Sequence, residues 1–249
     1  MLELLLVGIG TGNPEHLTLQ AIRALNAADL ILVPRKGPDK ADLADLRRTL
    51  CAEVVTNPAA RIVEFDMPVR DRADPNYFSG VDHWHDAIAQ IWSSTIEAER
   101  ADGGTVALLV WGDPALYDST HRIAARLRPA PRVRVIPGIT SIQAMCAAHA
   151  IALNTINAPF VVTTGRNLRA AGWPAGVDTL VVMLDADCAF QHLAPAGMTI
   201  WWGAYVGMPG EIVMSGPLAE TSPRIIEARA TARARHGWIM DIYLLRRGP

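Results

Sequence analysis

The sequence predicts an α/β protein with two α/β domains, the first built on a mainly parallel sheet and the second on a mixed sheet. Short apolar runs of strand length alternate with helical patterns over the first half of the chain, as they do where helices cover a parallel sheet. After Pro137-Gly138 the pattern changes to one helix of small residues followed by several strands. The chain has 249 residues, 50% of them hydrophobic, which is enough for one large core or two modest ones. We therefore expect domains at residues 1–137 and 138–249.

The first domain is expected to open with the strand LELLLVG (2–8), a continuous apolar run that ends in glycine. Thr18 can cap the helix that follows, because Leu19, Ile22 and Leu25 recur at helical spacing behind it. The same criteria predict further strands at 30–34, 61–68, 105–112 and 133–138, and further helices at 39–51, roughly 80–100 and 119–127. Strands joined by helices favour parallel pairing, because such a crossover returns the chain to the same edge of the sheet.

The second domain is expected to begin with the helix TSIQAMCAAHA (140–150). Apolar runs then predict strands at 160–165, 179–185, 198–204, 211–218 and 238–245. The segment between the third and fourth of these strands is too short for a helical crossover. We therefore expect 198–204 and 211–218 to pair antiparallel, which makes this sheet mixed.

Charge and cysteine content exclude several function classes. The formal net charge is −2 and the pI is about 6.4, so the sequence offers no long basic surface for nucleic acid. The three cysteines include no CxxC pair, so neither a zinc site nor a disulfide framework is expected. The N-terminus lacks the features of a signal peptide, and no apolar run approaches the roughly 18 residues of a membrane span. These features predict a cytoplasmic protein with no metal, no membrane contact and no nucleic-acid partner.

The first loop must be weighed as a dinucleotide site, because Gly8, Gly10 and Gly12 follow a strand. The Rossmann fingerprint is G-x-G-x-x-G, whereas the spacing here is G-x-G-x-G. Asn13 follows, and Pro14 then removes a backbone donor where a phosphate needs one. An NAD-dependent oxidoreductase is therefore the less favoured alternative from another function class.

A carboxylate lies in a stiff turn at the end of the strand 105–112, in Gly112-Asp113-Pro114. Gly112 permits a tight turn or a close approach to a ligand, and Pro114 fixes the next φ angle. Asp113 can act in ligand binding, or it can bond only to its own backbone as an Asx turn. The residue types alone leave both interpretations open.

Three motifs, in this order and spacing, resemble the tetrapyrrole methyltransferase family: VGIGTGNPEHLT (7–18), LVWGDPALYDST (109–120) and VIPGITSIQA (135–144). The resemblance covers essentially the whole chain. It implies two α/β domains with a cleft between them for S-adenosylmethionine (SAM), a tetrapyrrole substrate and a homodimer. The cofactor-binding residues that it implies are Gly112, Asp113, Pro114, Leu116, Tyr117, Thr140, Ser141, Leu184 and Trp201.

Within the family, the chain is most similar to the members that methylate C1 of a corrin precursor and release its acetyl group as acetate. YDST (117–120), TTGRNL (163–168) and GWIMDIYLLRR (237–247) are among the stretches that carry this narrower resemblance. Arg166 departs from the family, since many members have histidine after Thr-Gly. Methylation at another macrocycle position, or of a non-tetrapyrrole acceptor, remains an alternative.

The implied reaction requires a group that polarises the acyl carbonyl and a base that activates water. Tyr117 and Arg166 are candidates for the first role. Candidate bases are the carboxylates Asp118, Asp185, Glu211 and Asp241, and the sequence does not choose among them. Asp118 can instead cap the helix that starts at Ser119-Thr120.

Other polar side chains have simpler interpretations. His149 is expected to be a satisfied core histidine, and His83 and His85 are expected on a helix surface. The macrocycle carries many carboxylates, and the basic residues near strand ends that can pair with them are Arg35, Lys36, Arg70 and Arg72.

Overall fold

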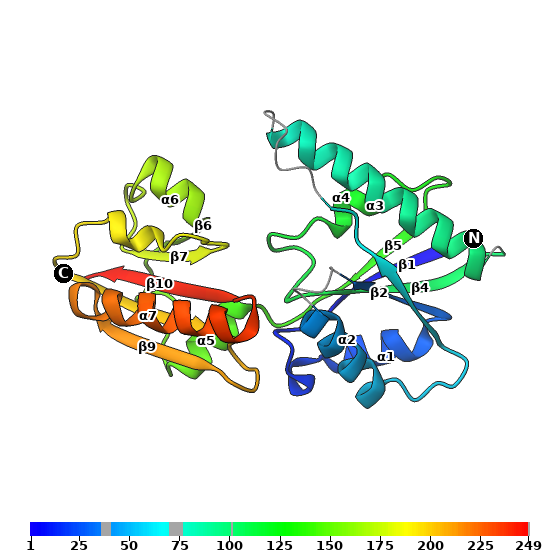
Figure 1. Ribbon diagram of the computed structural model, residues 1–249, viewed down its shortest axis with the longest axis horizontal. Helices are drawn as coiled ribbons and strands as arrows, with labels where there is room; N and C mark the ends of the chain where they lie inside the picture. The colour runs from blue at the N-terminus through cyan, green and yellow to red at the C-terminus, as the bar shows by residue number, and fades with distance from the viewer. Residues whose placement is uncertain (36–40, 70–76, 101, 249) are drawn as a thin grey trace. The chain divides into compact units, whose positions relative to one another are not determined.

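The computed structural model describes residues 1–35, 41–69, 77–100 and 102–248 (Figure 1). The chain divides into two compact units, Met1–Thr140 and Ser141–Pro249. The division falls slightly later than the expected boundary at 137/138. Gly138 belongs to the first unit, where its amide donates a hydrogen bond to Asp113 at 2.9 Å.

The first unit is built on a five-stranded sheet in the order β3-β2-β4-β1-β5, and every strand pair in it is parallel. The strands are β1 (Leu2–Gly8), β2 (Leu30–Arg35), β3 (Arg61–Asp66), β4 (Gly104–Val110) and β5 (Arg132–Ile136). The helices are η1 (Pro14–His16), α1 (Leu19–Ala27), α2 (Ala41–Val54), α3 (Tyr77–Glu99) and α4 (Thr120–Ala124). The predicted parallel sheet of the first domain is thus confirmed.

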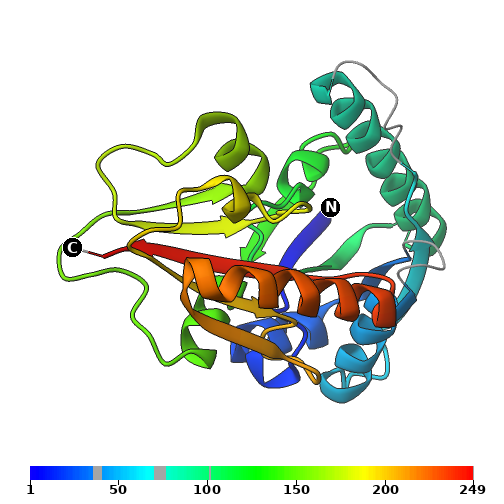
Figure 2. The same ribbon diagram turned by 60° about the vertical axis from the view of Figure 1, so that its left-hand side comes forward.

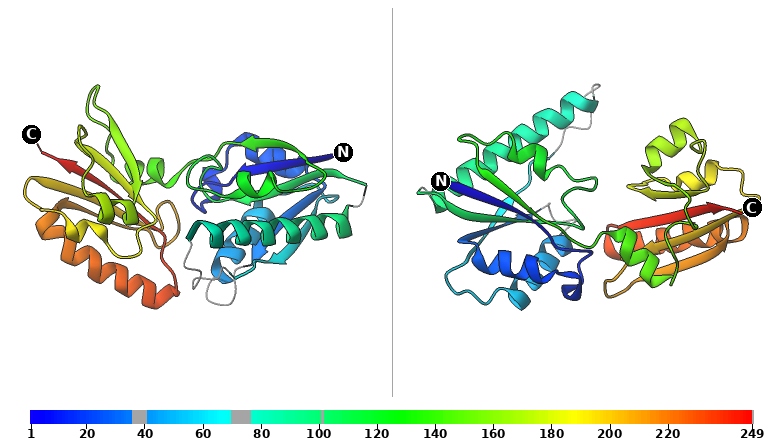
Figure 3. Two further views of the ribbon diagram at one scale, coloured as in Figure 1. Left: turned by 90° about the horizontal axis from the view of Figure 1, so that it is seen from above. Right: turned by 180° about the vertical axis from the view of Figure 1, so that it is seen from behind.

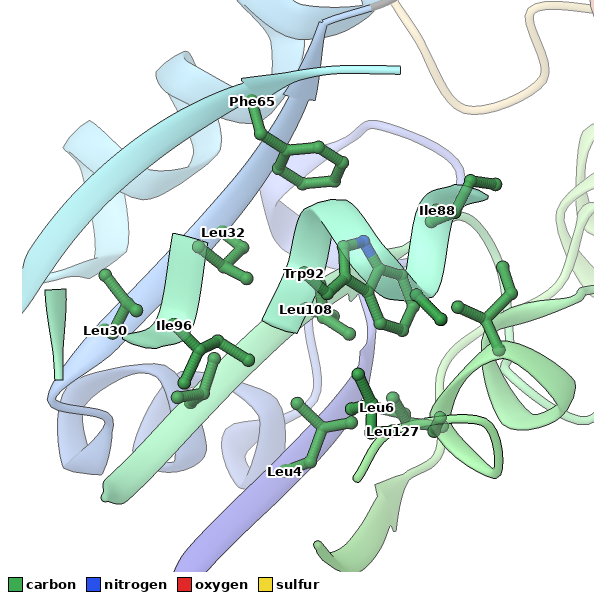
Figure 4. Packing of buried hydrophobic residues seen from close by; sticks show 14 of the residues in the cluster. Leu4, Leu6, Leu30, Leu32, Phe65, Ile88, Trp92, Ile96, Leu108 and Leu127 are labelled. Atoms are coloured by element: carbon green, nitrogen blue, oxygen red, sulfur yellow. The ribbon is translucent and has the colours of Figure 1, made fainter. Parts of the chain in front are cut away.

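The sheet of the first unit is covered on both faces, as parallel sheets are. Side chains of β1 alternate between two apolar cores, since neighbouring residues of a strand point to opposite faces. Leu4 and Leu6 pack in the core that contains Trp92 and Ile96 of α3, as Figure 4 shows. Leu5 and Val7 pack in the other core, with side chains of α1 and α2 that include Ala21, Leu25 and Leu50.

The second unit has a mixed sheet in the order β6-β7-β10-β8-β9. Its strands are β6 (Phe160–Thr164), β7 (Thr179–Met183), β8 (Met198–Ala204), β9 (Ile212–Pro217) and β10 (Asp241–Arg247). Only β6 and β7 pair in parallel, and the predicted antiparallel pairing of β8 with β9 is confirmed. The helices are α5 (Ser141–Ala148), α6 (Gly165–Ala171), η3 (Ala189–His192) and α7 (Leu218–His236).

Three helices of the second unit, α6, η3 and α7, have no counterpart among the elements expected from sequence. Helix α7 packs along β8 and β9 and is the long orange helix of Figure 2. Its buried positions recur at helical spacing, but two of them, Thr221 and Arg229, are polar, and Pro223 lies inside the helix. The sequence pattern of α7 is weak, so we infer that packing against the sheet stabilises this helix.

His85 does not lie on the helix surface that the sequence suggests. Its side chain is only 2% exposed, and neither ring nitrogen has a hydrogen-bond partner among the described residues. His83, two residues earlier, is exposed. Burial lowers the pKa of His85 below its usual value, and the nearby guanidinium of Arg126 lowers it further.

Replacing His85 with leucine is expected to reduce the acid sensitivity of the first unit. Below the unfolded-state pKa of about 6.5, the unfolded chain gains a proton on this ring that the folded state excludes, so the free energy of unfolding falls by up to about 1.4 kcal/mol per pH unit. Urea unfolding between about pH 7.5 and about pH 5 measures that slope. His83→Leu is the matched control and should retain the wild-type slope. Equal slopes in wild type and His85→Leu would contradict the prediction.

Candidate active site

Three loops that leave the carboxyl ends of β1, β4 and β5 meet through the backbones of four glycines, Gly8, Gly10, Gly112 and Gly138, which we call the glycine junction. The amide of Gly112 donates to the carbonyl of Gly10 at 2.7 Å, and the amide of Gly10 donates back to Gly112 at 3.3 Å. A Cβ atom at Gly8 would lie 2.6 Å from the amide nitrogen of Gly138, and one at Gly138 would lie 2.1 Å from the carbonyl oxygen of Gly112. The junction therefore admits no side chain at these two positions.

Asp113 bridges two of these loops. Its Oδ1 accepts a hydrogen bond from the amide of Ala115 at 2.8 Å, which is the Asx turn considered above. Its Oδ2 accepts a second bond, from the amide of Gly138 at 2.9 Å. The carboxylate thus does more than close its own turn, because it also fixes the loop after β4 to the loop after β5.

Replacing Asp113 with alanine is expected to lower the stability of the first unit by about 1–3 kcal/mol, because one partly buried amide, of Gly138, and one exposed amide, of Ala115, lose their acceptor. The same change should weaken binding of S-adenosylhomocysteine, since the loop after β4 loses its position. Urea unfolding and titration calorimetry measure the two effects. Asp66→Ala is the matched control: this carboxylate also ends a strand but pairs at the surface with Arg35, so its loss should cost less than about 1 kcal/mol. Unchanged affinity in Asp113→Ala would assign the carboxylate to stability alone.

The loop after Asp113 carries an exposed aromatic side chain on an uncommon backbone conformation. Tyr117 has a φ angle of +49° and is 45% exposed, and partial burial raises the pKa of its hydroxyl. Non-glycine residues with positive φ are uncommon and gather at functional sites. Thr140 also belongs to this edge, since a Cβ at Gly112 would lie 3.7 Å from its Cα. The N-cap of α4 is Ser119 and not Asp118, whose side chain instead accepts from the amide of Thr120 two residues later, as in an Asx turn.

The first loop is not built like a phosphate loop. The chain passes from β1 into the short 3-10 helix η1, and helix α1 begins only at Leu19. The amide of Gly10 is bonded to Gly112 instead of pointing to a ligand. This geometry disfavours the dinucleotide alternative, because a Rossmann pyrophosphate sits at the N-terminus of the first helix.

In the second unit, the carboxyl ends of the parallel strands β6 and β7 bring two predicted segments together. Thr164 caps α6 by accepting a bond from the amide of Asn167 at 3.3 Å, and Arg166 lies exposed in the first turn of that helix. Leu184, directly after β7, has a φ angle of +52° and is 66% exposed. An apolar side chain held in the open on left-handed backbone is a feature of ligand sites rather than of cores.

Asp185 follows Leu184 and is buried in a network of donors. Oδ2 accepts from the hydroxyl of Tyr243 at 2.6 Å and from the amide of Ala189 at 2.5 Å. Oδ1 accepts from Nη1 of Arg169 at 2.9 Å and from the amide of Asp187 at 3.1 Å. Burial alone would raise the pKa of Asp185, but these bonds outweigh it and hold the pKa below its usual value. The geometry favours a positioning role over the role of base, since both oxygens are already engaged.

Arg229 supports the same segment from the other side. It donates to the carbonyl oxygens of Asp185 and Ala186, at 2.8 and 2.9 Å, and pairs with the carboxylate of Asp241 at 2.9 Å. The indole of Trp202 donates to that carboxylate as well, so Asp241 is also an engaged group. Sequence reasoning missed Arg229, which lies in the unexpected helix α7 and has no motif around it.

The other predicted residues of the second unit lie in varied surroundings. Glu211 is exposed, and its Oε2 accepts from the amide of Gly207 at 2.6 Å. Trp201 is half-buried, with the guanidinium of Arg246 over its ring at 5.2 Å from the centroid. Ser141 is the first residue of α5. His149, expected to be satisfied, does bond to the carbonyl of Trp202, at 3.0 Å.

The predicted residues thus fall in two groups. The first unit holds Gly112, Asp113, Pro114, Leu116, Tyr117 and Thr140, and the second holds Ser141, Arg166, Leu184, Asp185, Trp201 and Glu211. Within the described ranges, no three His, Cys, Asp or Glu side chains gather as metal ligands do. No helix in the same ranges is long and apolar enough to span a membrane. Arg35 is paired with Asp66, and Lys36, Arg70 and Arg72 lie outside the described residues.

Three known proteins are similar to this chain over most or all of its length. The precorrin-6A synthase (deacetylating) of Sinorhizobium sp. is 51% identical over 252 residues, which cover 100% of this chain and 96% of that one. The crystal structure of a cobalamin-synthesis-related protein (CobF) of Corynebacterium diphtheriae superposes with a TM-score of 0.84 at 37% identity and covers 100% of both chains. A uroporphyrin-III C-methyltransferase of Thermus thermophilus, solved with S-adenosylhomocysteine, has the same fold, with a TM-score of 0.61 at 22% identity over 98% of this chain and 92% of that one.

The family model for tetrapyrrole (corrin/porphyrin) methylases matches residues 3–222. That range includes the glycine junction, Asp113 with its two hydrogen bonds, and the exposed Leu184 after β7. The resemblance inferred from the three sequence motifs is confirmed. This chain belongs to the tetrapyrrole methylase family.

Proposed function

We propose that this protein is a SAM-dependent methyltransferase of cobalamin biosynthesis that methylates C1 of precorrin-5 and releases the C1 acetyl group as acetate, giving precorrin-6A. The observation that carries the proposal is the 51% identity, over 100% of this chain, to a precorrin-6A synthase (deacetylating). The position of the candidate residues also supports the proposal. Asp113 and Leu184 lie in loops at the carboxyl ends of β4 and β7, and ligands of open α/β sheets bind at such strand ends.

SAM, when bound, supplies an electrophilic methyl group on a sulfonium. The residues present fit such a ligand. Leu184 and Tyr117 offer exposed apolar surface on fixed, left-handed backbone, and Thr140 and Ser141 offer hydroxyl groups. We propose that these residues hold SAM together with the backbone of Gly112, Asp113 and Pro114, the neighbouring Leu116, and Trp201.

The chain's own task in the reaction is to prepare C1. Adding water to the acetyl carbonyl and breaking its bond to C1 releases acetate and two protons, and leaves an electron pair on C1 for methylation. A donor near the acyl oxygen would stabilise the oxyanion. We propose Tyr117 or Arg166 for this role. Glu211 remains as a proposed base, since Asp185 and Asp241 are engaged elsewhere.

Product analysis with precorrin-5, isotopically labelled SAM and purified protein tests the function. Acetate and the methylated product should appear in equal amounts. Methylation without acetate would point to another macrocycle position, and no methyl transfer at all would reject the proposal. A melting temperature raised by NAD and not by S-adenosylhomocysteine would instead favour the oxidoreductase alternative.

Replacing Tyr117 with phenylalanine is expected to lower kcat about 10²-fold if its hydroxyl stabilises the oxyanion. The ring is retained, so affinity for S-adenosylhomocysteine and the melting temperature should stay as in wild type. Acetate release under saturating substrate measures the effect. An unchanged kcat would remove Tyr117 from the catalytic candidates and leave Arg166.

We also propose that the protein acts as a homodimer in the cytoplasm, as the family resemblance implies. Light scattering at micromolar concentration tests the first statement, since a monomer has a mass of 26.9 kDa.

A further inference from the structure

Arg47, in the middle of α2, is a buried cation whose surroundings are unusual. Its side chain is only 3% exposed. Its guanidinium donates one hydrogen bond, from Nη1 to the carbonyl of Leu43 in its own helix, at 3.2 Å. Nε is buried and has no hydrogen-bond partner in the part of the chain that the structure describes. An arginine has five donors in a fixed fork, so most of the capacity of this one is unused.

No acidic side chain among the described residues forms an ion pair with Arg47. Burial lowers its pKa to about 10, and the carboxylate of Asp118 acts in the opposite direction. Asp118 itself is bonded to the amide and hydroxyl of Thr120. The guanidinium therefore keeps its charge at neutral pH without an ion-pair partner among residues 1–35, 41–69, 77–100 and 102–248. The next residue, Arg48, is by contrast paired with Asp45 and Glu64 at the surface.

A second unused donor lies beside Arg47. The guanidinium stacks over the ring of Trp111, with Cζ 4.8 Å from the ring centroid. The indole Nε1 of Trp111 is also buried, and no described residue accepts a hydrogen bond from it. Buried donors are nearly always satisfied in folded proteins, so two adjacent exceptions require an explanation. Trp111 directly precedes Gly112 and Asp113, at the carboxyl end of β4.

The chemistry of the missing partner follows from these donors. It must accept hydrogen bonds, and it must be anionic, because an unpaired buried cation is strongly unfavourable. A carboxylate meets both conditions, since its oxygens match the planar fork of arginine.

We propose that Arg47 and the indole N–H of Trp111 form a carboxylate-binding site for a ligand of this enzyme. The proposal rests on the proposed function. Two ligands of that reaction carry a carboxylate: the macrocycle, and SAM through its amino-acid part. Arg47 was not among the basic residues that the sequence singled out, because nothing in the pattern of α2 distinguishes it from Arg48.

Three variants test the site. Arg47→Met removes the charge at similar length, Trp111→Phe removes the N–H and keeps the ring, and Arg48→Met is the matched control one residue away. For each we would measure the KM for precorrin-5, the Kd for S-adenosylhomocysteine and the melting temperature of the free protein. Arg47→Met should weaken one ligand about 10- to 100-fold, and Trp111→Phe should weaken the same ligand by a smaller factor. Arg48→Met should leave both ligands unchanged.

The melting temperature separates a binding role from a structural one. A buried cation whose counter-ion is a ligand lowers the stability of the free protein. Arg47→Met should therefore melt at the wild-type temperature or above it. A raised KM for precorrin-5 assigns the site to the macrocycle, and a raised Kd for S-adenosylhomocysteine assigns it to SAM. Unchanged values for both ligands, or a lower melting temperature with both ligands weakened together, would overturn the proposal. A wild-type protein that neither turns over precorrin-5 nor binds S-adenosylhomocysteine would instead reject the proposed function.

Discussion

Alanine at position 138 is expected to lower the free energy of unfolding of the first unit by about 3 kcal/mol or more and to abolish measurable binding of S-adenosylhomocysteine. The added Cβ would lie 2.1 Å from the carbonyl oxygen of Gly112 and within 3 Å of the backbone of Gly8. Backbone atoms cannot turn aside as a flexible side chain can, so the loops after β1, β4 and β5 must separate. Urea unfolding and calorimetry on the same preparation measure both losses.

Gly112→Ala is the matched control for Gly138→Ala. Its Cβ would meet only Thr140, at ordinary contact distances of 3.7 Å and beyond. Its φ angle of +63° still strains a side chain, so a loss of about 1–2 kcal/mol is expected. Equal losses in the two variants would show that backbone conformation, and not the close approach of the three loops, makes these glycines necessary.

Replacing Asp185 with asparagine is expected to lower the free energy of unfolding of the second unit by about 3–5 kcal/mol. An amide nitrogen would then face groups that donate, such as Tyr243 and Ala189, because each carboxylate oxygen now accepts two bonds. Leu184 would lose its fixed position, so affinity for S-adenosylhomocysteine should fall as well. Asp187→Asn is the control: this exposed carboxylate pairs with Arg169 at 3.1 Å, and its loss should cost less than about 1 kcal/mol.

The same carboxylate predicts a dependence on pH. The pKa of Asp185 is lowered in the folded state, so its contribution is present above the unfolded-state pKa of about 3.9 and is lost as the pH falls below that value. Wild type should therefore lose stability in this range, and Asp185→Asn should lose less. A variant as stable as wild type at neutral pH would show that the network is not needed for folding.

Strands and local turns could be predicted from the sequence, because short-range patterns determine them. The run Leu2–Gly8 is apolar on both faces, and the Asp113-Pro114 turn closes on its own backbone. The antiparallel pairing of β8 with β9 followed from the length of the segment between them. These features need no knowledge of distant residues.

The hydrogen bonds that hold the candidate site in place could not be predicted, because they join residues far apart in the chain. Asp185 is held by Tyr243, and the carbonyl oxygen of Asp185 by Arg229, each more than 40 positions away. His85 is buried and Arg47 lies over Trp111 for the same reason: tertiary packing, not local pattern, decides their surroundings. Polar residues without a motif carry no sequence signal for such contacts.

The strand orders of the two sheets have a consequence for synthesis on the ribosome. Strand β1, the dark blue strand at the N-terminus in Figure 3, lies between β4 and β5. Its pairs join residues as distant as Leu2 and Gly104. Strand β10 is likewise paired on both sides, by β7 and β8. The central pairings of each sheet therefore form only after most of its unit has left the ribosome. Until β4 and β5 have emerged, the apolar strand β1 has neither of the strands with which it pairs. Nascent chains should thus depend on chaperones for longer than hairpin-built proteins of this length, since non-local pairing is slow.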